Sequence, residues 1–146
     1  MVKYIALYSP SSVNMVVDFV KTIYVFPNVI PVVINPIGAA AQFGVPEAYK
    51  LSYKIGKPLV ILPSIEDLRE VLGINRIFYY SETGSTISLE EFRSIDNYSI
   101  VFGAELSLGK KELLNVEPIR VNGIPPDLPT VPLVTLILYL VTRGNW

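Results

Sequence analysis

The chain contains no cysteine and no histidine among its 146 residues. Without cysteine there is no disulfide, no thiolate metal site and no thiol nucleophile. Without histidine, imidazole acid–base chemistry, a Ser-His-Asp triad and the usual zinc sites are excluded as well. Any metal would have to be held by carboxylate and carbonyl oxygens alone, and we predict no metal site.

Charge is also scarce. Only 17% of the residues are charged, the formal net charge is −1 and the pI is about 5.4. This balance argues against a protein that grips nucleic acid by bulk electrostatics, and it leaves room only for a local basic patch. Because 51% of the residues are hydrophobic, the composition excludes intrinsic disorder and is sufficient for a sizeable core.

Long hydrophobic runs are missing too. The longest, residues 131–141, is interrupted by Pro132 and Thr135, and it is shorter than the roughly 20 residues that a membrane span requires. The first ten residues, MVKYIALYSP, have too short an apolar run for a signal peptide. We therefore expect a soluble, cytoplasmic protein with no membrane partner.

Short apolar strands alternate with helical stripes along the whole chain. We predict strands at residues 4–8, 29–34, 59–62, 76–80, 98–102 and 117–121, and helices at 13–23, 47–55, 65–72, 110–114 and 131–142, with a helical turn at 39–43 and a short helix after Ser88. This alternation predicts an α/β fold with a mainly parallel six-stranded sheet flanked by helices. No repeat or linker interrupts it, so we expect one domain spanning residues 1–146.

Three local features refine this prediction. Ser64 and Ser88 each stand three residues before an acidic residue, a spacing typical of the capping box that begins a helix. Pro31 cannot donate a backbone hydrogen bond, so the first residues of its strand are expected at an edge of the sheet.

Three loops follow the last three strands: SETGS at 81–85, GAELSLG at 103–109 and NGIPPDLPT at 122–130. The carboxyl ends of parallel strands meet at one edge of a sheet, where small ligands bind in such folds. Glycine lets the backbone of these loops approach a ligand, and the prolines of the third loop stiffen it. Neither a GxxxxGK[ST] phosphate loop nor a GxGxxG dinucleotide motif is present.

The same loops resemble those of the SPOUT class of RNA methyltransferases. Phe102, Gly103, Glu105 and Gly109 match the Phe-Gly-x-Glu…Gly pattern of that family's second motif. Ile124 and Pro125 match the start of its third motif, and Thr83 and Gly84 match its earlier threonine–glycine loop. The resemblance covers roughly residue 76 to the end of the chain.

The resemblance implies a C-terminal trefoil knot, S-adenosylmethionine bound in the knot loops, and a homodimer formed through the C-terminal helix. The substrate it implies is RNA, either tRNA or rRNA. The cofactor-binding residues that it implies are Thr83, Gly84, Gly103, Glu105, Gly109, Ile124, Pro125, Leu128, Val131 and Leu133. Glu105 is interpreted mainly as an organiser of its loop that accepts backbone N–H groups.

Two departures from the family pattern bear on catalysis. Thr130-Val131-Pro132 stands where the family has Ser-Leu-Asn, and no arginine precedes Arg69, although the family's first motif has one. Asp127 is the candidate general base, and a turn residue within PPDLP is an equally good interpretation of it. The leading hypothesis is an S-adenosylmethionine-dependent RNA methyltransferase. The alternatives are a knot protein that binds the cofactor or RNA without methyl transfer and, ranked lower, a nuclease.

Two further features allow two interpretations each. Lys50, Lys54 and Lys57 form a basic cluster that either contacts an RNA backbone or is simply a solvated helix face, which is the commoner case. Tyr79 and Tyr80, at the end of a strand, either stack on a base or on adenine, or pack in the core.

Overall fold

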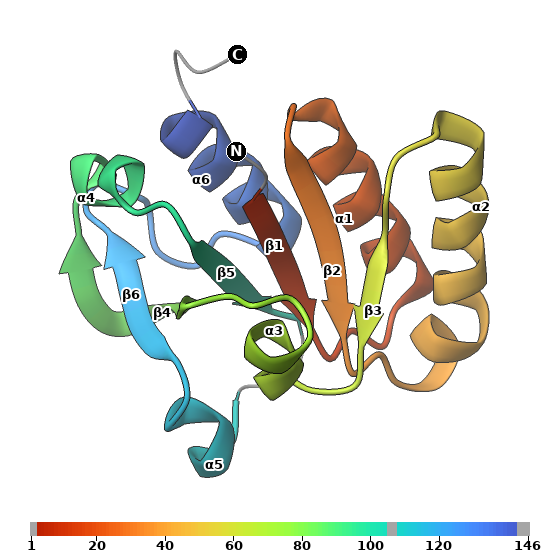
Figure 1. Cartoon of the computed structure of the whole chain (residues 1–146), viewed down its shortest axis with the longest axis horizontal. Helices are drawn as coiled ribbons and strands as arrows, with labels where there is room; N and C mark the ends of the chain where they lie inside the picture. Colours follow the sequence, from red (N-terminus) through yellow and green to blue (C-terminus); the bar gives the residue numbers. More distant parts are fainter. Residues whose placement is uncertain (1–2, 105–107, 143–146) are drawn as a thin grey trace.

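The computed structural model describes residues 3–104 and 108–142. Six strands form one sheet in the order β3-β2-β1-β5-β4-β6, and every neighbouring pair is parallel (Figure 1). The strands are β1 (Lys3–Tyr8), β2 (Val29–Ile34), β3 (Val60–Leu62), β4 (Arg76–Ile87), β5 (Tyr98–Gly103) and β6 (Glu117–Val121). The predicted α/β fold with a six-stranded parallel sheet is therefore confirmed.

Helices cover both faces of the sheet. The larger core joins the sheet to α1 (Val13–Val25), α2 (Val45–Ile55), α4 (Leu89–Ser94) and α6 (Thr130–Thr142). The smaller core lies on the other face, under α3 (Glu66–Glu70) and the segments that flank α5 (Lys110–Leu113). In β1, Ile5 and Leu7 point into the larger core while Ala6 and Tyr8 point into the smaller one. This double coverage explains why the central strands are continuously apolar.

Pro31 lies where the edge prediction placed it. It pairs with Ile5 of β1, whereas pairing with the outer strand β3 begins only at Val32. The first half of β2 is therefore open on the β3 side, and the missing N–H of Pro31 leaves no gap in a ladder.

Strand β4 is longer than predicted and irregular. Ile119 of β6 pairs with both Tyr80 and Ser85, so residues 81–84 leave the ladder and the strand resumes at Ser85. The polar sequence SETG looks like the start of a loop, but the chain returns to β6. Gly84 allows this return, because a Cβ atom at this position would lie 2.5 Å from the backbone nitrogen of Ile119.

Of the two predicted capping boxes, one is confirmed and one is wrong. At α4, the Ser88 hydroxyl accepts the Glu91 N–H and the Glu91 carboxylate accepts the Ser88 N–H. At α3, the Ser64 hydroxyl instead donates to the Asp67 carboxylate at 3.0 Å, and the helix begins at Glu66 without a side-chain cap. The predicted helical turn at 39–43 is a π-helical segment, Ala40–Gly44, which runs directly into α2.

The C-terminal helix α6 packs against α1, α4 and β5. Val134, Ile137, Leu138 and Val141 are buried, which satisfies most of the apolar surface that makes this helix unusual. Within residues 3–104 and 108–142, no helix has the length and apolar character needed to cross a membrane.

An ion pair joins the start of β4 to the edge strand β6. The Arg76 guanidinium donates to both carboxylate oxygens of Glu117, at 2.7 and 3.0 Å, and lies 4.9 Å from the ring centroid of Phe78. Hydrogen bonding to Arg76 holds the pKa of Glu117 below its ordinary value. The pair therefore stabilises the fold above the ordinary pKa of glutamate, and this contribution is lost as the pH falls through the lowered pKa of Glu117.

Replacing Glu117 with glutamine is expected to lower the free energy of unfolding at neutral pH by at most about 1 kcal/mol, because both side chains are nearly half exposed. Urea unfolding of wild type and Glu117→Gln at pH 7 and at pH 3 checks this. The difference between the two proteins should shrink at pH 3, and a constant difference would contradict the assignment. Glu66→Gln removes a longer, 4.0 Å contact with Arg69 and is the matched control.

Candidate functional site

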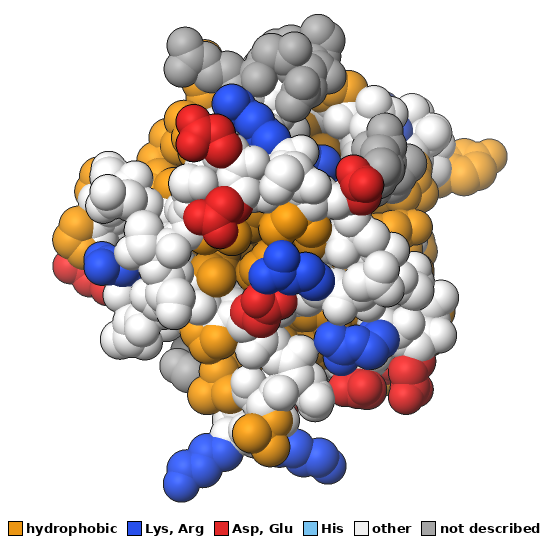
Figure 2. Space-filling view, turned by 60° about the vertical axis from the view of Figure 1, so that its left-hand side comes forward, with side chains coloured by type: hydrophobic (Ala, Val, Ile, Leu, Met, Phe, Trp, Pro, Cys, Tyr) orange, Lys and Arg blue, Asp and Glu red, His pale blue; other side chains and the backbone are white. Residues whose placement is uncertain are grey.

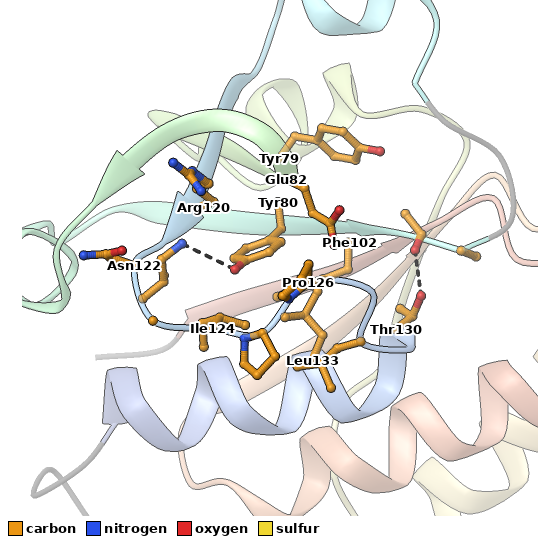
Figure 3. A pocket seen from close by; sticks show the side chains of 16 residues that line it. Tyr79, Tyr80, Glu82, Phe102, Arg120, Asn122, Ile124, Pro126, Thr130 and Leu133 are labelled. Carbon is orange, nitrogen blue, oxygen red and sulfur yellow. Dashed lines mark hydrogen bonds between the residues drawn. The ribbon is translucent and has the colours of Figure 1, made fainter.

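A cavity of about 560 Å³ opens at the carboxyl ends of β4, β5 and β6 (Figure 3). It is lined from β4 by Tyr79, Tyr80 and Glu82, from the end of β5 by Phe102, Gly103 and Ala104, from β6 and the loop after it by Arg120 to Pro126 and Leu128, and from α6 by Thr130 and Leu133. Its size is within the range of small-molecule sites. The three loops singled out in the sequence therefore do meet, because all three strands run in the same direction.

Two stacked aromatic rings form one wall of the cavity. The Tyr80 and Phe102 rings lie nearly parallel, with centroids 5.9 Å apart and an interplanar angle of 17°. The Val121 N–H donates to the Tyr80 hydroxyl at 3.4 Å, which ties this wall to the end of β6. Ile124 and Leu133 lie on the other side of the Tyr80 ring, toward α6 (Figure 3). These apolar side chains make a surface suited to a flat, weakly polar group.

Two hydrogen bonds, at Asp127 and Thr130, attach the loop after β6 to the other strands around the cavity. The Asp127 N–H donates to Oε1 of Glu82 at 2.6 Å, which attaches the loop to the excursion of β4. The Thr130 hydroxyl donates to the carbonyl oxygen of Gly103 at 3.0 Å, which attaches the start of α6 to the end of β5. These bonds hold the loops around the cavity in place, which lowers the entropic cost of binding a ligand.

Two exposed side chains of opposite charge, Glu82 and Arg120, line the cavity. In Figure 3 Arg120 lies on the side of Tyr80 that faces away from α6. No hydrogen bond or ion pair joins Arg120 to any residue that the structure describes. Acidic and basic side chains are interspersed on this side of the molecule, with no field of one sign (Figure 2).

Tyr79 also lines the cavity, but its ring points away from Tyr80 and the apolar surface (Figure 3). Burial raises the pKa of its phenol above the ordinary value. Tyr79 is therefore neutral at physiological pH and offers a hydrogen-bond donor rather than a base.

Five of the residues predicted to bind a cofactor line the cavity: Gly103, Ile124, Pro125, Leu128 and Leu133. Four others lie elsewhere. Thr83 is exposed and its N–H and hydroxyl both contact the Ser81 hydroxyl, Gly84 lies against the backbone of β6, Gly109 precedes α5, and Val131 packs on the larger core. Glu105 lies outside the described residues.

Asp127, the predicted candidate base, is exposed and does not line the cavity. Its φ of 62° is in the left-handed region, which asparagine and aspartate tolerate in turns. Only its backbone N–H reaches the site, through Glu82. The geometry favours the interpretation of Asp127 as a turn residue.

The basic cluster of α2 is remote from the cavity, since α2 lies beside β3, at the edge of the sheet opposite to β6 (Figure 1). Lys57 donates to the Tyr24 carbonyl oxygen at 2.7 Å and lies 6.0 Å from the centroid of the Tyr24 ring. Lys50 pairs with Glu47 at 3.4 Å. Of the three lysines, two therefore have partners within the protein, and the cluster is not a single free patch.

Sequence reasoning missed Arg120 and Asn122. No motif marks either residue, and the only available signal was the alternation of β6, in which Ile119 and Val121 are buried and Arg120 points outward. Which outward residues face a cavity depends on how far the loop after β6 folds back, and strand alternation does not encode that.

Solved structures with the same fold include methyltransferases, and the printed names of some of them refer to RNA. This chain superimposes on the SpoU methyltransferase AviRb from Streptomyces viridochromogenes, in complex with AdoMet, with a TM-score of 0.72, 14% identity and coverage of 99% of this chain and 60% of that one. A structure that concerns 2-OH methylation of C/U34 on tRNA gives a TM-score of 0.71, 19% identity and coverage of 99% and 96%. An rRNA methyltransferase from Sinorhizobium meliloti gives a TM-score of 0.70 and 12% identity, with coverage of 99% of this chain and 57% of that one. At these identities the likeness shows the fold alone.

Sequence relatives carry different names. A protein of Aeropyrum pernix, provisionally named a type II restriction enzyme, is 30% identical over 143 residues, which cover 95% of this chain and 92% of that protein. A protein of Methanocaldococcus jannaschii with the same kind of name is 30% identical over 112 residues, which cover 75% of this chain and 77% of that protein. The model of the family described as RecB-family nuclease (DUF2122) matches residues 38–140. The chain therefore belongs to the RecB-family nuclease (DUF2122) family, and its fold is that of the SpoU methyltransferases.

Proposed function

We propose that the chain binds S-adenosylmethionine in the cavity at the ends of β4, β5 and β6. The observation that carries the proposal is the position of this cavity, which is built from the loops that resemble the SPOUT motifs, within a fold shared with a methyltransferase solved in complex with AdoMet. The cavity volume of about 560 Å³ suits a ligand of this size.

The residues of the cavity fit the adenosyl part of this cofactor. Ile124, Pro126 and Leu133 offer an apolar surface for the adenine ring, and Gly103 lets the backbone at the end of β5 approach the ligand. We assign the hydrogen bonds to the ring nitrogens and the ribose to backbone groups of lining residues in this loop, such as Asn122 and Gly123. When bound, the cofactor supplies an electrophilic methyl group.

For the reaction, we propose methyl transfer to RNA. The fold neighbours that act on tRNA and rRNA support the substrate class. The described side chains hold the loops around the cavity, through the bonds of Glu82 and Thr130. The departures at Thr130–Pro132 and the absence of an arginine before Arg69 motivate the alternative of cofactor or RNA binding without transfer.

The proposal is tested by calorimetric titration of the protein with S-adenosylmethionine, followed by incubation with radiolabelled cofactor and bulk RNA. Saturable one-to-one binding supports the cofactor site, and label in the RNA supports transfer. Binding without transfer favours the non-catalytic alternative. A folded protein that does not bind the cofactor refutes the proposal.

DNA hydrolysis is the second candidate, because the names of the sequence relatives point to it. Such hydrolysis commonly uses metal ions held by several carboxylates. In the part of the chain that the structure describes, no group of three or more His, Cys, Asp or Glu could hold a metal, and Glu82 is the described carboxylate that lines the cavity. The described residues do not fit such a centre. Incubation of plasmid DNA with the protein and Mg²⁺ tests the candidate directly.

Two further proposals concern architecture. The resemblance of these loops to the SPOUT motifs supports a trefoil knot at the loop after β6, within the fold shared with a SpoU methyltransferase. Stretching single molecules would reveal a knot as a shortened unfolded chain. Pro132, Thr135 and Tyr139 form an exposed stripe on α6 and support a homodimer through this helix. Light scattering that gives a monomer mass would refute the dimer.

We also propose a cytoplasmic location, which fractionation of cells would check.

A further inference from the structure

We infer that Arg120 and Glu82 form a subsite for a zwitterionic α-amino-acid group, the guanidinium for its carboxylate and the glutamate for its ammonium. This inference rests on the proposed function, since S-adenosylmethionine ends in such a group. It assigns that end of the ligand to two residues that match no motif of the resemblance.

Arg120 is placed to act on a ligand rather than on the protein. It lies between Ile119 and Val121, both buried, so its own side chain is turned out of the core and lines the cavity. No described residue pairs with it, whereas the three other described arginines each have a partner: Arg69 lies 4.0 Å from Glu66, Arg76 donates to Glu117, and Arg93 donates to the Leu140 carbonyl oxygen. A guanidinium binds a carboxylate through two parallel N–H groups, which gives it both affinity and orientation.

Glu82 reaches the cavity through the irregularity of β4. The residues 81–84 leave the ladder between Tyr80 and Ser85, and this excursion carries Glu82 to the cavity (Figure 3). One carboxylate oxygen, Oε1, accepts the Asp127 N–H at 2.6 Å, which fixes the position of the side chain. Among the described residues, none donates to the other oxygen.

The cavity is divided by polarity in the way that such a ligand requires. Arg120 lies on the side of the Tyr80 ring that faces away from α6, and Ile124 and Leu133 lie on the side toward α6 (Figure 3). Glu82 lies between these two parts, because its carboxylate accepts the N–H of Asp127, next to Pro126. Glu82 and Arg120 together carry no net charge, and neither does an amino-acid group at neutral pH. A phosphate or a nucleic-acid backbone would instead favour two or more cations at this rim.

The experiment compares two ligands that differ only at this end. S-adenosylhomocysteine carries the amino-acid group, whereas 5′-methylthioadenosine has the same adenosine and a neutral thioether but lacks it. Each ligand is titrated calorimetrically into wild type, Arg120→Gln and Glu82→Gln, and thermal unfolding verifies the fold of each variant. Arg69→Gln, which removes another exposed arginine, from α3, is the matched control for net charge.

For Arg120→Gln we expect the affinity for S-adenosylhomocysteine to fall at least tenfold, while the affinity for 5′-methylthioadenosine changes less than twofold. Glu82→Gln should also lower the affinity for S-adenosylhomocysteine more than that for 5′-methylthioadenosine, but by a smaller factor than Arg120→Gln. Arg69→Gln should change neither affinity. An equal loss for both ligands, or no loss for either, overturns the subsite. If wild type binds 5′-methylthioadenosine no more weakly than S-adenosylhomocysteine, the subsite is also overturned while the adenosyl pocket stands. If wild type binds neither ligand, the proposed function fails and the subsite with it.

Discussion

Replacing Phe78 with alanine is expected to lower the free energy of unfolding by about 3–5 kcal/mol, the range for a large aromatic side chain in a packed core. Phe78 is fully buried in β4 and makes edge-on contacts with Phe92 of α4 and Tyr98 of β5, with ring centroids 5.4 and 5.8 Å away. Phe92 and Tyr98 contact each other as well, at 5.5 Å. Removing Phe78 therefore leaves a cavity where β4, α4 and β5 meet. Chemical denaturation followed by circular dichroism measures the loss.

A matched control comes from the surface. Leu114 is 85% exposed at the end of α5, so Leu114→Ala should change the free energy of unfolding by no more than about 0.5 kcal/mol. Comparable effects of the two substitutions would show that the aromatic cluster does not carry the packing described here.

Replacing Gly84 with alanine is expected to lower the free energy of unfolding by about 1–3 kcal/mol, the range for overpacking a close contact. A Cβ atom at this position would lie 2.5 Å from the Ile119 nitrogen and 2.6 Å from the Pro118 carbonyl carbon. Both are backbone atoms of β6, so relief requires a strand to move. Because β6 leads into the loop around the cavity, the same change should weaken binding of S-adenosylmethionine. Denaturation and calorimetric titration test the two effects separately.

Gly109→Ala is the control, since the nearest atom that a Cβ would meet there is a carboxylate oxygen of Glu112, at 3.0 Å on a flexible side chain. This substitution should change the free energy of unfolding by no more than about 0.5 kcal/mol. A Gly84→Ala protein as stable as Gly109→Ala would mean that β4 and β6 do not approach as closely as the structure has them.

The family description and the names of the fold neighbours refer to different chemistry. The family description and the names of the sequence relatives refer to nucleases, whereas the fold neighbours are RNA methyltransferases. Neither a fold nor a family name establishes a reaction, because the reaction depends on the groups in the site. The site described here offers an apolar surface, stacked aromatics and one pair of opposite charges. Our proposal of a nucleoside ligand with a charged tail rests on these groups.

Much of the fold was predictable because it rests on local patterns. Continuous apolar runs such as Val29–Ile34 predicted strands covered on both faces, and Ser88 with Glu91 predicted the start of α4. The failure at Ser64 has a local cause too: its hydroxyl bonds the Asp67 side chain instead of a backbone N–H, and spacing alone does not distinguish these outcomes.

By itself, the sequence determined the parallel α/β architecture and the position of the cavity. Both follow from local patterns, namely the alternation of strands with helices and the residues of the loops that follow the strands. Only the tertiary structure decided which side chains line the cavity. The pairing of Ile119 with both Tyr80 and Ser85 turns 81–84 out of the sheet, brings Glu82 to the rim and packs Gly84 on β6. Arg120 faces the same cavity because the loop at 122–129 folds back and is held there by Glu82 and Gly103. These contacts join residues more than twenty positions apart, so no local pattern reports them.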